Sequence, residues 1–321
     1  MKFYRKYLAI FISAILAGLT IHLLLFYINL SVPISSQKNF HGWYQVKNTY
    51  ASSIKQPKLI FISGSNSLFG VDTERIEREL HIPTVNYGVA ASLNLYTIHH
   101  VRQYLKKGDI VILPLEYRFY ELSHTSFESN YVQYILGYAP DVFHAMPLDS
   151  KISFITQLTP RELLKATYQQ LYPPKVPEKD GYDSKYLNSN GDMTNNHIEE
   201  MTPADTLRNK ISPTVFKSPP LTTDAQQELE NFLMYCQGNG IKVYAAWPSY
   251  LWKEKEFTGK DLDGIHAIEK FYHEHDVEIL GNYTDCLYDA EMFYDTEYHL
   301  NEEGKRIHTD YLIELLKEKL R

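Results

Sequence analysis

The segment KLIFISGSNSLFG, residues 58–70, is the part of the sequence that decides the fold. A short apolar run ends in serine and glycine, as a buried strand does when it reaches a turn. The segment DTERIEREL, residues 72–80, follows with Asp72 at the helix N-cap position and acidic residues in the first turn. The two segments together predict a strand, a small-residue turn and a helix.

The same alternation continues along the chain. Four more apolar runs have the length and the ending of buried strands, and four more segments have helical periodicity. The strands are expected at 84–87, 110–115, 241–247 and 277–280, and the helices at 93–107, 223–237, 262–275 and 302–320. Alternating strands and helices favour parallel βαβ units. The fold class is therefore predicted as α/β, a flavodoxin-like three-layer α/β/α sandwich with a five-stranded parallel sheet, and ligands are expected at the carboxyl ends of the strands.

An apolar segment precedes this pattern. Tyr7–Leu30 is almost wholly apolar, and residues 7–37 contain no Asp, Glu, Lys or Arg. About 20 apolar residues cross a bilayer as a helix, so the segment predicts one N-terminal transmembrane helix. The basic residues Lys2, Arg5 and Lys6 place the N-terminus in the cytoplasm and the rest outside, in the periplasm or extracellular space. A cleaved signal peptide is the alternative, but its apolar core is usually shorter and a small-residue cleavage site should follow.

The chain is expected to comprise a cytoplasmic tip with an anchor, residues 1–36, and an α/β domain, residues 37–321. Residues 31–56 are interpreted as a juxtamembrane linker with some local structure. An insertion at about 118–221, rich in proline and asparagine turns, interrupts the strand pattern. We expect it to pack over the strand ends as a lid or a substrate platform.

Composition excludes some classes of function. The net charge is −7 and no basic run follows the N-terminus, which argues against a nucleic-acid partner. The 26 tyrosines suit either a sugar-facing cleft or ordinary packing. Cys236 and Cys286 match no metal spacing and are expected as buried free thiols, with a disulfide as the alternative. His273 and His275 lack a third ligand, so we expect a solvated helix end, and neither a metal nor a cofactor is predicted.

Chemistry is expected at the ends of the strands. Ser65 follows the first strand, where free N–H groups near a helix start can stabilise an oxyanion, and Gly88 follows the second strand. His299 precedes the last helix and suits a general base. Asp295 lies four residues earlier, so one helical turn would bring it to His299. Ser67 is the alternative to Ser65 as nucleophile, and Asp285 and Asp289 are the alternatives to Asp295 as acid. Trp247 and Tyr250 follow the fourth strand and are expected either to line the cleft or to pack in the core.

In these blocks the chain resembles the SGNH hydrolase superfamily, which is related to the GDSL-type esterases. Ser63-Gly64-Ser65 stands where that family has Gly-Asp-Ser, with Gly70 five residues on. Gly88 is similar to its second block, and His299 with Leu300-Asn301 to its last block. The resemblance covers roughly 58–115 and 226–320 and implies a catalytic set of Ser65, Asp295 and His299, with Ser65 and Gly88 as oxyanion donors.

The chain departs from the family in two places. Pro114-Leu115-Glu116-Tyr117 stands where the family has Gly-x-Asn-Asp after the third strand, so the third oxyanion donor has no counterpart. Asn66 and Asn94 are possible substitutes. The acid precedes the histidine by four residues and not by three.

In these departures the chain resembles membrane-anchored SGNH-like proteins that work beside integral membrane O-acyltransferases. Those proteins assist acetylation of polysaccharides or D-alanylation of teichoic acids. The resemblance implies an extracytoplasmic serine esterase or O-acyltransferase, with a cell-envelope glycan and an integral membrane O-acyltransferase as partners. A non-catalytic adaptor with the same fold and a glycan-binding surface protein are the alternatives.

Overall fold

The computed structural model describes residues 2–123, 127–172, 181–212, 214–216, 220–252 and 256–320. The chain forms two compact units. One combines residues 1–38 with 124–179, and the other combines residues 39–123 with 180–321. The segment predicted as one insertion, 118–221, is therefore divided between the two units.

The second unit is built on a five-stranded, wholly parallel sheet. Its strand order is β2-β1-β3-β4-β6. The strands are β1 (Leu59–Phe61), β2 (Thr84–Asn86), β3 (Ile110–Leu113), β4 (Lys242–Ala246) and β6 (Glu278–Leu280). Central strand β1 pairs with β2 and β3, so that Phe61 lies between Asn86 and Ile112. The predicted α/β class and its five parallel strands are confirmed.

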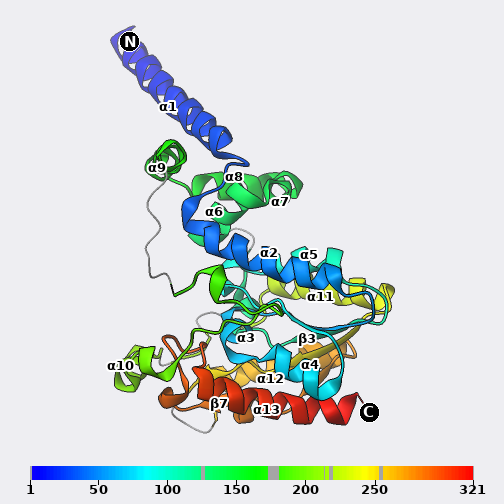
Figure 1. Ribbon diagram of the computed structural model, residues 1–321. Helices are drawn as coiled ribbons and strands as arrows, with labels where there is room; N and C mark the ends of the chain where they lie inside the picture. Colours follow the sequence, from blue (N-terminus) through cyan, green and yellow to red (C-terminus); the bar gives the residue numbers. More distant parts are fainter. Residues whose placement is uncertain are drawn as a thin grey trace. The chain divides into compact units, whose positions relative to one another are not determined.

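Helices cover both faces of the sheet (Figure 1). α4 (Thr73–Leu80) and α13 (Glu302–Lys319) lie on one face, where Leu312 and Leu316 join a buried cluster with Leu59 and Phe61. α2 (Lys38–Ser53), α5 (Tyr96–Val101) and α11 (Thr223–Gly238) lie on the other face. The remaining elements of this unit are α3 (Ser65–Gly70), α10 (Ala204–Lys210), α12 (Lys260–Glu274) and the parallel pair β5 (Tyr250–Leu251) and β7 (Leu287–Tyr288).

Helix α2 corrects the expectation that residues 31–56 form a linker. Trp43, Tyr44, Lys47 and Ala51 are buried on one side of this helix. The Lys47 ammonium donates 2.8 Å and 2.5 Å hydrogen bonds to the carbonyls of Asn86 and Gly191. A stripe containing a lysine and a tyrosine does not look apolar in sequence, which is why periodicity missed the helix.

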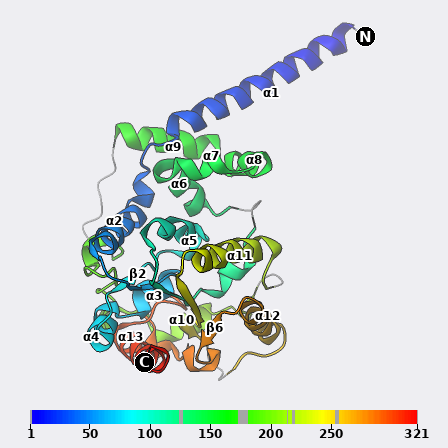
Figure 2. The ribbon, with the colours of Figure 1, turned by 90° about the vertical axis from the view of Figure 1, so that its right-hand side faces the viewer.

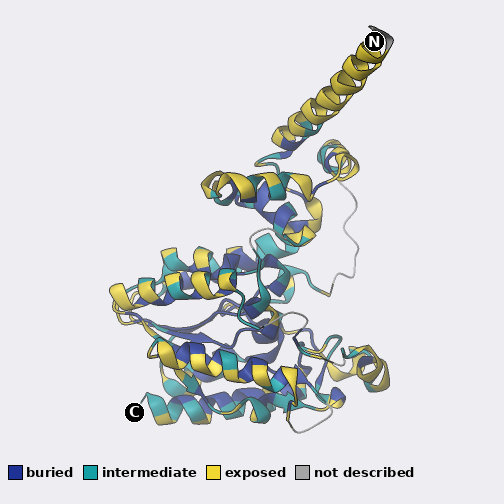
Figure 3. Cartoon of the chain, turned by 180° about the vertical axis from the view of Figure 1, so that it is seen from behind, coloured by how far each residue is buried: buried dark blue, intermediate teal, exposed yellow. Residues whose placement is uncertain are grey.

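The first unit contains α1 (Lys2–Asn29), α6 (Ser129–Tyr138), α7 (Pro140–Ala145), α8 (Leu148–Thr156) and α9 (Pro160–Leu171). Within α1, residues 4–29 are long and apolar enough to cross a membrane. Most of this helix is exposed, as the yellow colouring in Figure 3 shows. Figure 2 shows α7, α8 and α9 gathered near the C-terminal end of α1.

Candidate active site

Ser65 is the first residue of α3, directly after the turn that ends β1. Gly64 precedes it as the N-cap in an extended conformation. The Ser65 side chain is half-buried, and its hydroxyl donates a 3.2 Å hydrogen bond to Oε1 of Glu116. As the first residue of a helix, Ser65 has a backbone N–H without an acceptor inside the helix.

Glu116 is one of two residues of the site that sequence reasoning missed. It follows β3 and is 2% exposed, and its Oε1 also accepts a 3.0 Å hydrogen bond from the Asn66 N–H. Burial raises the pKa of this carboxyl, although the hydrogen bond from Asn66 and the charge of nearby His299 oppose the rise. Its position at a strand end was the available signal, because side chains gather at that edge of a parallel sheet.

Gly64 makes room for this carboxyl. A Cβ at position 64 would lie 2.2 Å from Oε1 and 2.6 Å from Cδ of Glu116. Any side chain there would force Glu116 to move. The second residue of the Ser-Gly-Ser turn is therefore matched to the glutamate that follows β3.

Asp295 and His299 lie together, as predicted. Nδ1 of His299 is 2.6 Å from Oδ1 of Asp295, and His299 is 6% exposed. Burial opposes ionisation of Asp295, but the hydrogen bond and charge of His299 outweigh it and lower the pKa of this carboxyl. The contact comes from a loop closed by the antiparallel bridge Phe293–Leu300, where the sequence pattern suggested a helical turn.

Tyr182 completes the surroundings of this pair. Its hydroxyl donates to Oδ2 of Asp295 and lies 3.4 Å from Nδ1 of His299. The Trp43 indole holds the same residue by donating a 3.0 Å hydrogen bond to the Tyr182 carbonyl. Tyr182 belongs to the predicted insertion, and no sequence pattern singled it out.

Phe69 and Glu116 connect the serine with the histidine. The Phe69 ring, one helical turn after Ser65, stacks on the imidazole of His299 with centroids 4.1 Å apart and an interplanar angle of 11°. Glu116 accepts the Ser65 hydroxyl and is close enough to His299 for an electrostatic interaction. No hydrogen bond joins Ser65 to His299 in the part of the chain that the structure describes.

The predicted oxyanion donors differ in availability. The Gly88 N–H donates a 2.8 Å hydrogen bond to Oδ1 of Asn86. A Cβ on Gly88 would lie 2.5 Å from the Leu68 nitrogen, so this position requires glycine. The Asn66 amide donates to the Pro114 carbonyl at 2.8 Å, and Asn94 ends a 3₁₀ turn with a φ of 51°. Among these candidates, the Ser65 N–H is the donor that the helix start leaves without a helical acceptor.

The rival candidates have other surroundings. The Ser67 hydroxyl is fully buried, and it lacks a partner among the described residues, whereas Ser65 is half-buried. Asp285 accepts a 3.1 Å hydrogen bond from Tyr311. Trp247 and Tyr250 are buried in edge-to-face aromatic packing.

Other side chains of the described ranges give no metal centre. They contain no group of three or more His, Cys, Asp or Glu residues able to hold a metal ion. The His275 ring lies 2.7 Å from the Phe271 carbonyl and 3.5 Å from the Glu230 carboxylate. Cys236 and Cys286 are free thiols, both buried.

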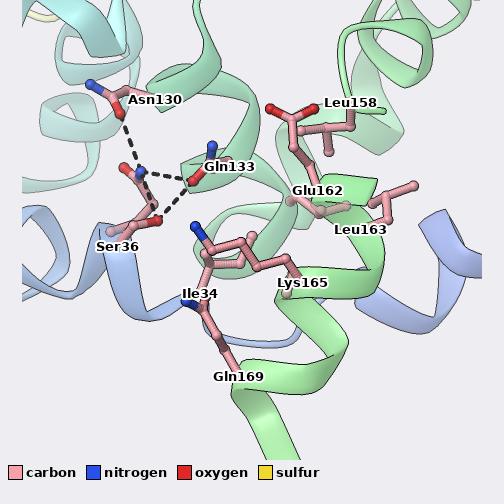
Figure 4. Close-up of a pocket in the computed structure, with 12 residues that line it drawn as sticks. Ile34, Ser36, Asn130, Gln133, Leu158, Glu162, Leu163, Lys165 and Gln169 are labelled. Carbon is pink, nitrogen blue, oxygen red and sulfur yellow. Dashed lines mark hydrogen bonds between the residues drawn. The ribbon is translucent and has the colours of Figure 1, made fainter. Parts of the chain in front are cut away.

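A separate cavity lies in the first unit, beside α9, and contains none of the predicted catalytic residues (Figure 4). It has a volume of about 290 Å³. Ser36, Gln37, Asn130 and Gln133 form a hydrogen-bonded polar cluster on its wall. Glu162, Lys165 and Gln169 of α9 line it from another side.

Comparison with models of known protein families finds no match for this sequence. A search of curated proteins also finds no match. The crystal structure of protein YxiM from Bacillus subtilis is similar at 9% sequence identity and a TM-score of 0.39. The similarity covers 82% of this chain and 57% of the other, so the chain spans little more than half the length of that protein.

Proposed function

We propose that this protein is a membrane-anchored serine acyl-ester hydrolase or O-acyltransferase of the SGNH type. Ser65 is the nucleophile, His299 the general base and Asp295 its orienting acid. The observation that supports this most is the 2.6 Å contact of His299 with Asp295. The same imidazole stacks on Phe69, which belongs to the helix that begins with Ser65. A base oriented by a third group beside a nucleophile is the arrangement that acyl transfer needs.

The proposed reaction has two steps. Nδ1 of His299 is held by Asp295, which leaves Nε2 to take the proton from the Ser65 hydroxyl as Oγ attacks the ester carbonyl. The Ser65 N–H stabilises the oxyanion, and the leaving alcohol departs with the proton from Nε2, leaving an acyl-serine. A glycan hydroxyl or water then gives its proton to Nε2 and attacks the acyl-serine. Ser65 recovers that proton when the new ester or the acid leaves.

The Ser65–Glu116 hydrogen bond sets a condition on this chemistry. The hydroxyl must turn from Glu116 to His299 before it can react, because a carboxylate acceptor and an imidazole base cannot both take the same proton. The same bond favours a second candidate function, a non-catalytic adaptor that keeps the fold and docks on a membrane-bound O-acyltransferase. In that case Glu116 holds Ser65 permanently.

The cellular setting belongs to the same proposal. The basic residues Lys2, Arg5 and Lys6 lie in the first turns of α1, before its apolar part, so the positive-inside rule puts the N-terminus in the cytoplasm and the sheet unit outside. The acyl acceptor would then be a cell-envelope polysaccharide or a related glycan. An integral membrane O-acyltransferase would be the acyl source. Nucleic acid is no part of the proposal, since a net charge of −7 disfavours binding to phosphates.

Purified full-length protein tests the proposal with p-nitrophenyl acetate and with a fluorophosphonate that labels nucleophilic serines. Ser65→Ala should abolish both turnover and labelling, and peptide mapping of the wild type should place the label on Ser65. Ser67→Ala is the matched control and should keep both signals. Unchanged turnover in Ser65→Ala would refute the enzyme, and absence of both signals in a folded wild type would support the adaptor.

A further inference from the structure

Helix α9 has an exposed apolar face. Leu164, Tyr168, Leu171 and Tyr172 are 55%, 61%, 71% and 63% exposed. Their spacing of four, three and one residues puts them on one side of the helix and its C-cap. Apolar side chains that are exposed next to one another in this way indicate contact with a partner or a membrane.

The other sides of α9 are already occupied. Its Leu163 carbonyl and Thr167 hydroxyl accept hydrogen bonds of 3.2 Å and 3.0 Å from the Asn29 amide of α1. Glu162 and Gln169 line the polar cavity of Figure 4. The apolar stripe therefore lies on a third side of α9, which faces neither α1 nor the cavity.

Helix α8 repeats the pattern. Leu148 and Ile152, four residues apart, are 75% and 56% exposed, while Phe154 is buried against Phe26 of α1. The ring of His22 lies 3.1 Å from the Ile155 carbonyl at the end of α8. Two helices that carry exposed apolar side chains therefore pack on the last two turns of α1.

The contacts on α1 fix the level of these helices. His22 and Asn29 are seven residues apart, which is roughly 10 Å of helix rise. The candidate span has 26 residues, whereas about 20 suffice to cross the hydrocarbon. Counted from Tyr7, the first residue after Arg5 and Lys6, about 20 residues reach Phe26, so Asn29 lies at the level of the headgroups and His22 just inside the hydrocarbon. Helices α8 and α9 pack against this stretch of α1.

We infer that α8 and α9 lie in the outer interface of the membrane that α1 crosses, with the stripe formed by Leu148, Ile152, Leu164, Tyr168, Leu171 and Tyr172 in contact with lipid. Tyrosine prefers the headgroup level because its ring is apolar and its hydroxyl polar. The inference does not depend on the chemistry proposed for Ser65.

Charge at the edge of the stripe favours lipid over a protein partner. Arg161 is exposed on the same side of α9 as the stripe, and the exposed Lys165 lies between the stripe and the cavity that it lines. Basic side chains beside an apolar face are typical of helices that lie in an anionic membrane surface. Both helices that carry these six residues also contact the span, so a bilayer around α1 lies next to each of them.

Site-directed spin labelling of the full-length protein in vesicles of phosphatidylethanolamine and phosphatidylglycerol tests this. Leu164→Cys, Tyr168→Cys and Ile152→Cys carry the label on the stripe. Gln169→Cys, on the cavity side of α9, and Glu303→Cys, on α13, are the controls. The native thiols are buried, so the unsubstituted protein serves as the labelling blank. Because the labelled stripe positions are exposed, the variants should fold as the wild type does, and circular dichroism checks their folding.

Collisions with oxygen and with a water-soluble nickel chelate report depth. The stripe labels should show several-fold higher oxygen-to-nickel accessibility than both controls. Equal accessibility at stripe and control positions would overturn the inference. Protection from both reagents in native membranes, together with water accessibility in pure lipid, would also overturn it and assign the stripe to an integral membrane protein.

Discussion

The hydroxyl of Ser65 donates its hydrogen bond to Glu116, 3.2 Å away, and not to the imidazole of His299. The same carboxyl oxygen takes the Asn66 N–H, at the start of the helix that presents the serine. One buried acidic side chain thus accepts hydrogen bonds from both the Ser65 hydroxyl and the neighbouring Asn66 N–H. In the proposed mechanism, Ser65 can react only when Glu116 releases its hydroxyl.

Replacing Glu116 tests this control. Glu116→Ala frees the Ser65 hydroxyl and the Asn66 N–H, so labelling of Ser65 by fluorophosphonate should be faster than in the wild type. Glu116→Gln keeps an oxygen acceptor of the same shape, so its labelling rate should stay close to that of the wild type. The ratio of the two rates separates release of the hydroxyl from loss of charge. Slower labelling in Glu116→Ala would instead make the carboxyl an aid to the reaction.

Gly64→Ala should destabilise the sheet unit, because the new Cβ would lie 2.2 Å from Oε1 of Glu116. Overpacking of this kind costs about 1–3 kcal/mol. Urea unfolding would measure this cost. In the double variant Gly64→Ala/Glu116→Ala the loss in free energy of unfolding should be smaller than the sum of the losses in the two single variants, because the clash with Glu116 is gone. Gly238→Ala is the matched control, as nothing lies within 4 Å of its Cβ position. Additive losses would show that the two positions are independent.

Asp295→Asn should lower kcat for an acyl-ester probe by roughly 10²–10⁴-fold, since an amide no longer holds His299 in the productive tautomer. Tyr182→Phe removes one hydrogen bond to the same carboxylate. A hydrogen bond to a charged group contributes about 1.5–3 kcal/mol, so its effect on kcat should be the smaller of the two. Initial rates at saturating substrate measure both. A larger loss in Tyr182→Phe would give Tyr182 a direct role in the reaction.

His308 makes stability depend on pH. It is buried in α13, and burial lowers its pKa from 6.5 to about 4. Between pH 6.5 and 4 His308 is protonated in the unfolded chain but neutral in the folded protein, so the free energy of unfolding falls as the pH drops. The loss should reach at most about 3 kcal/mol by pH 4. His308→Asn keeps a polar partner for Tyr288 and should flatten the decline between pH 6.5 and 4, measured by urea unfolding at several pH values. Parallel curves for the two proteins would rule out His308 as the source.

The strands and most helices could be predicted because their signals are local. The run 58–62 and Gly88 mark strand ends without any tertiary information, and 223–237 and 302–320 match α11 and α13 within two residues. Asp295 and His299 were found for the same reason, since both stand in one short segment before the last helix.

The missed residues depend on distant parts of the chain. Glu116 looked like a departure from a family pattern, and its role is evident only when the Gly64 turn is seen to leave space for it. Tyr182 reaches Asp295 across 113 residues of sequence. The stripe on α9 was hidden because its residues read as one ordinary amphipathic helix, and its exposure is known only once α1 is seen on another side.

The sheet unit is assembled from the two ends of a divided sequence, and this bears on how the protein is made. Strand β3 pairs with β4, which is translated after the whole of residues 124–179. The core around β1 is complete only when α13 packs on it. A chain leaving the ribosome therefore carries an unpaired strand edge until β4 has been made. We expect its biogenesis to be slow and to need protection from aggregation until β4 and α13 have been made.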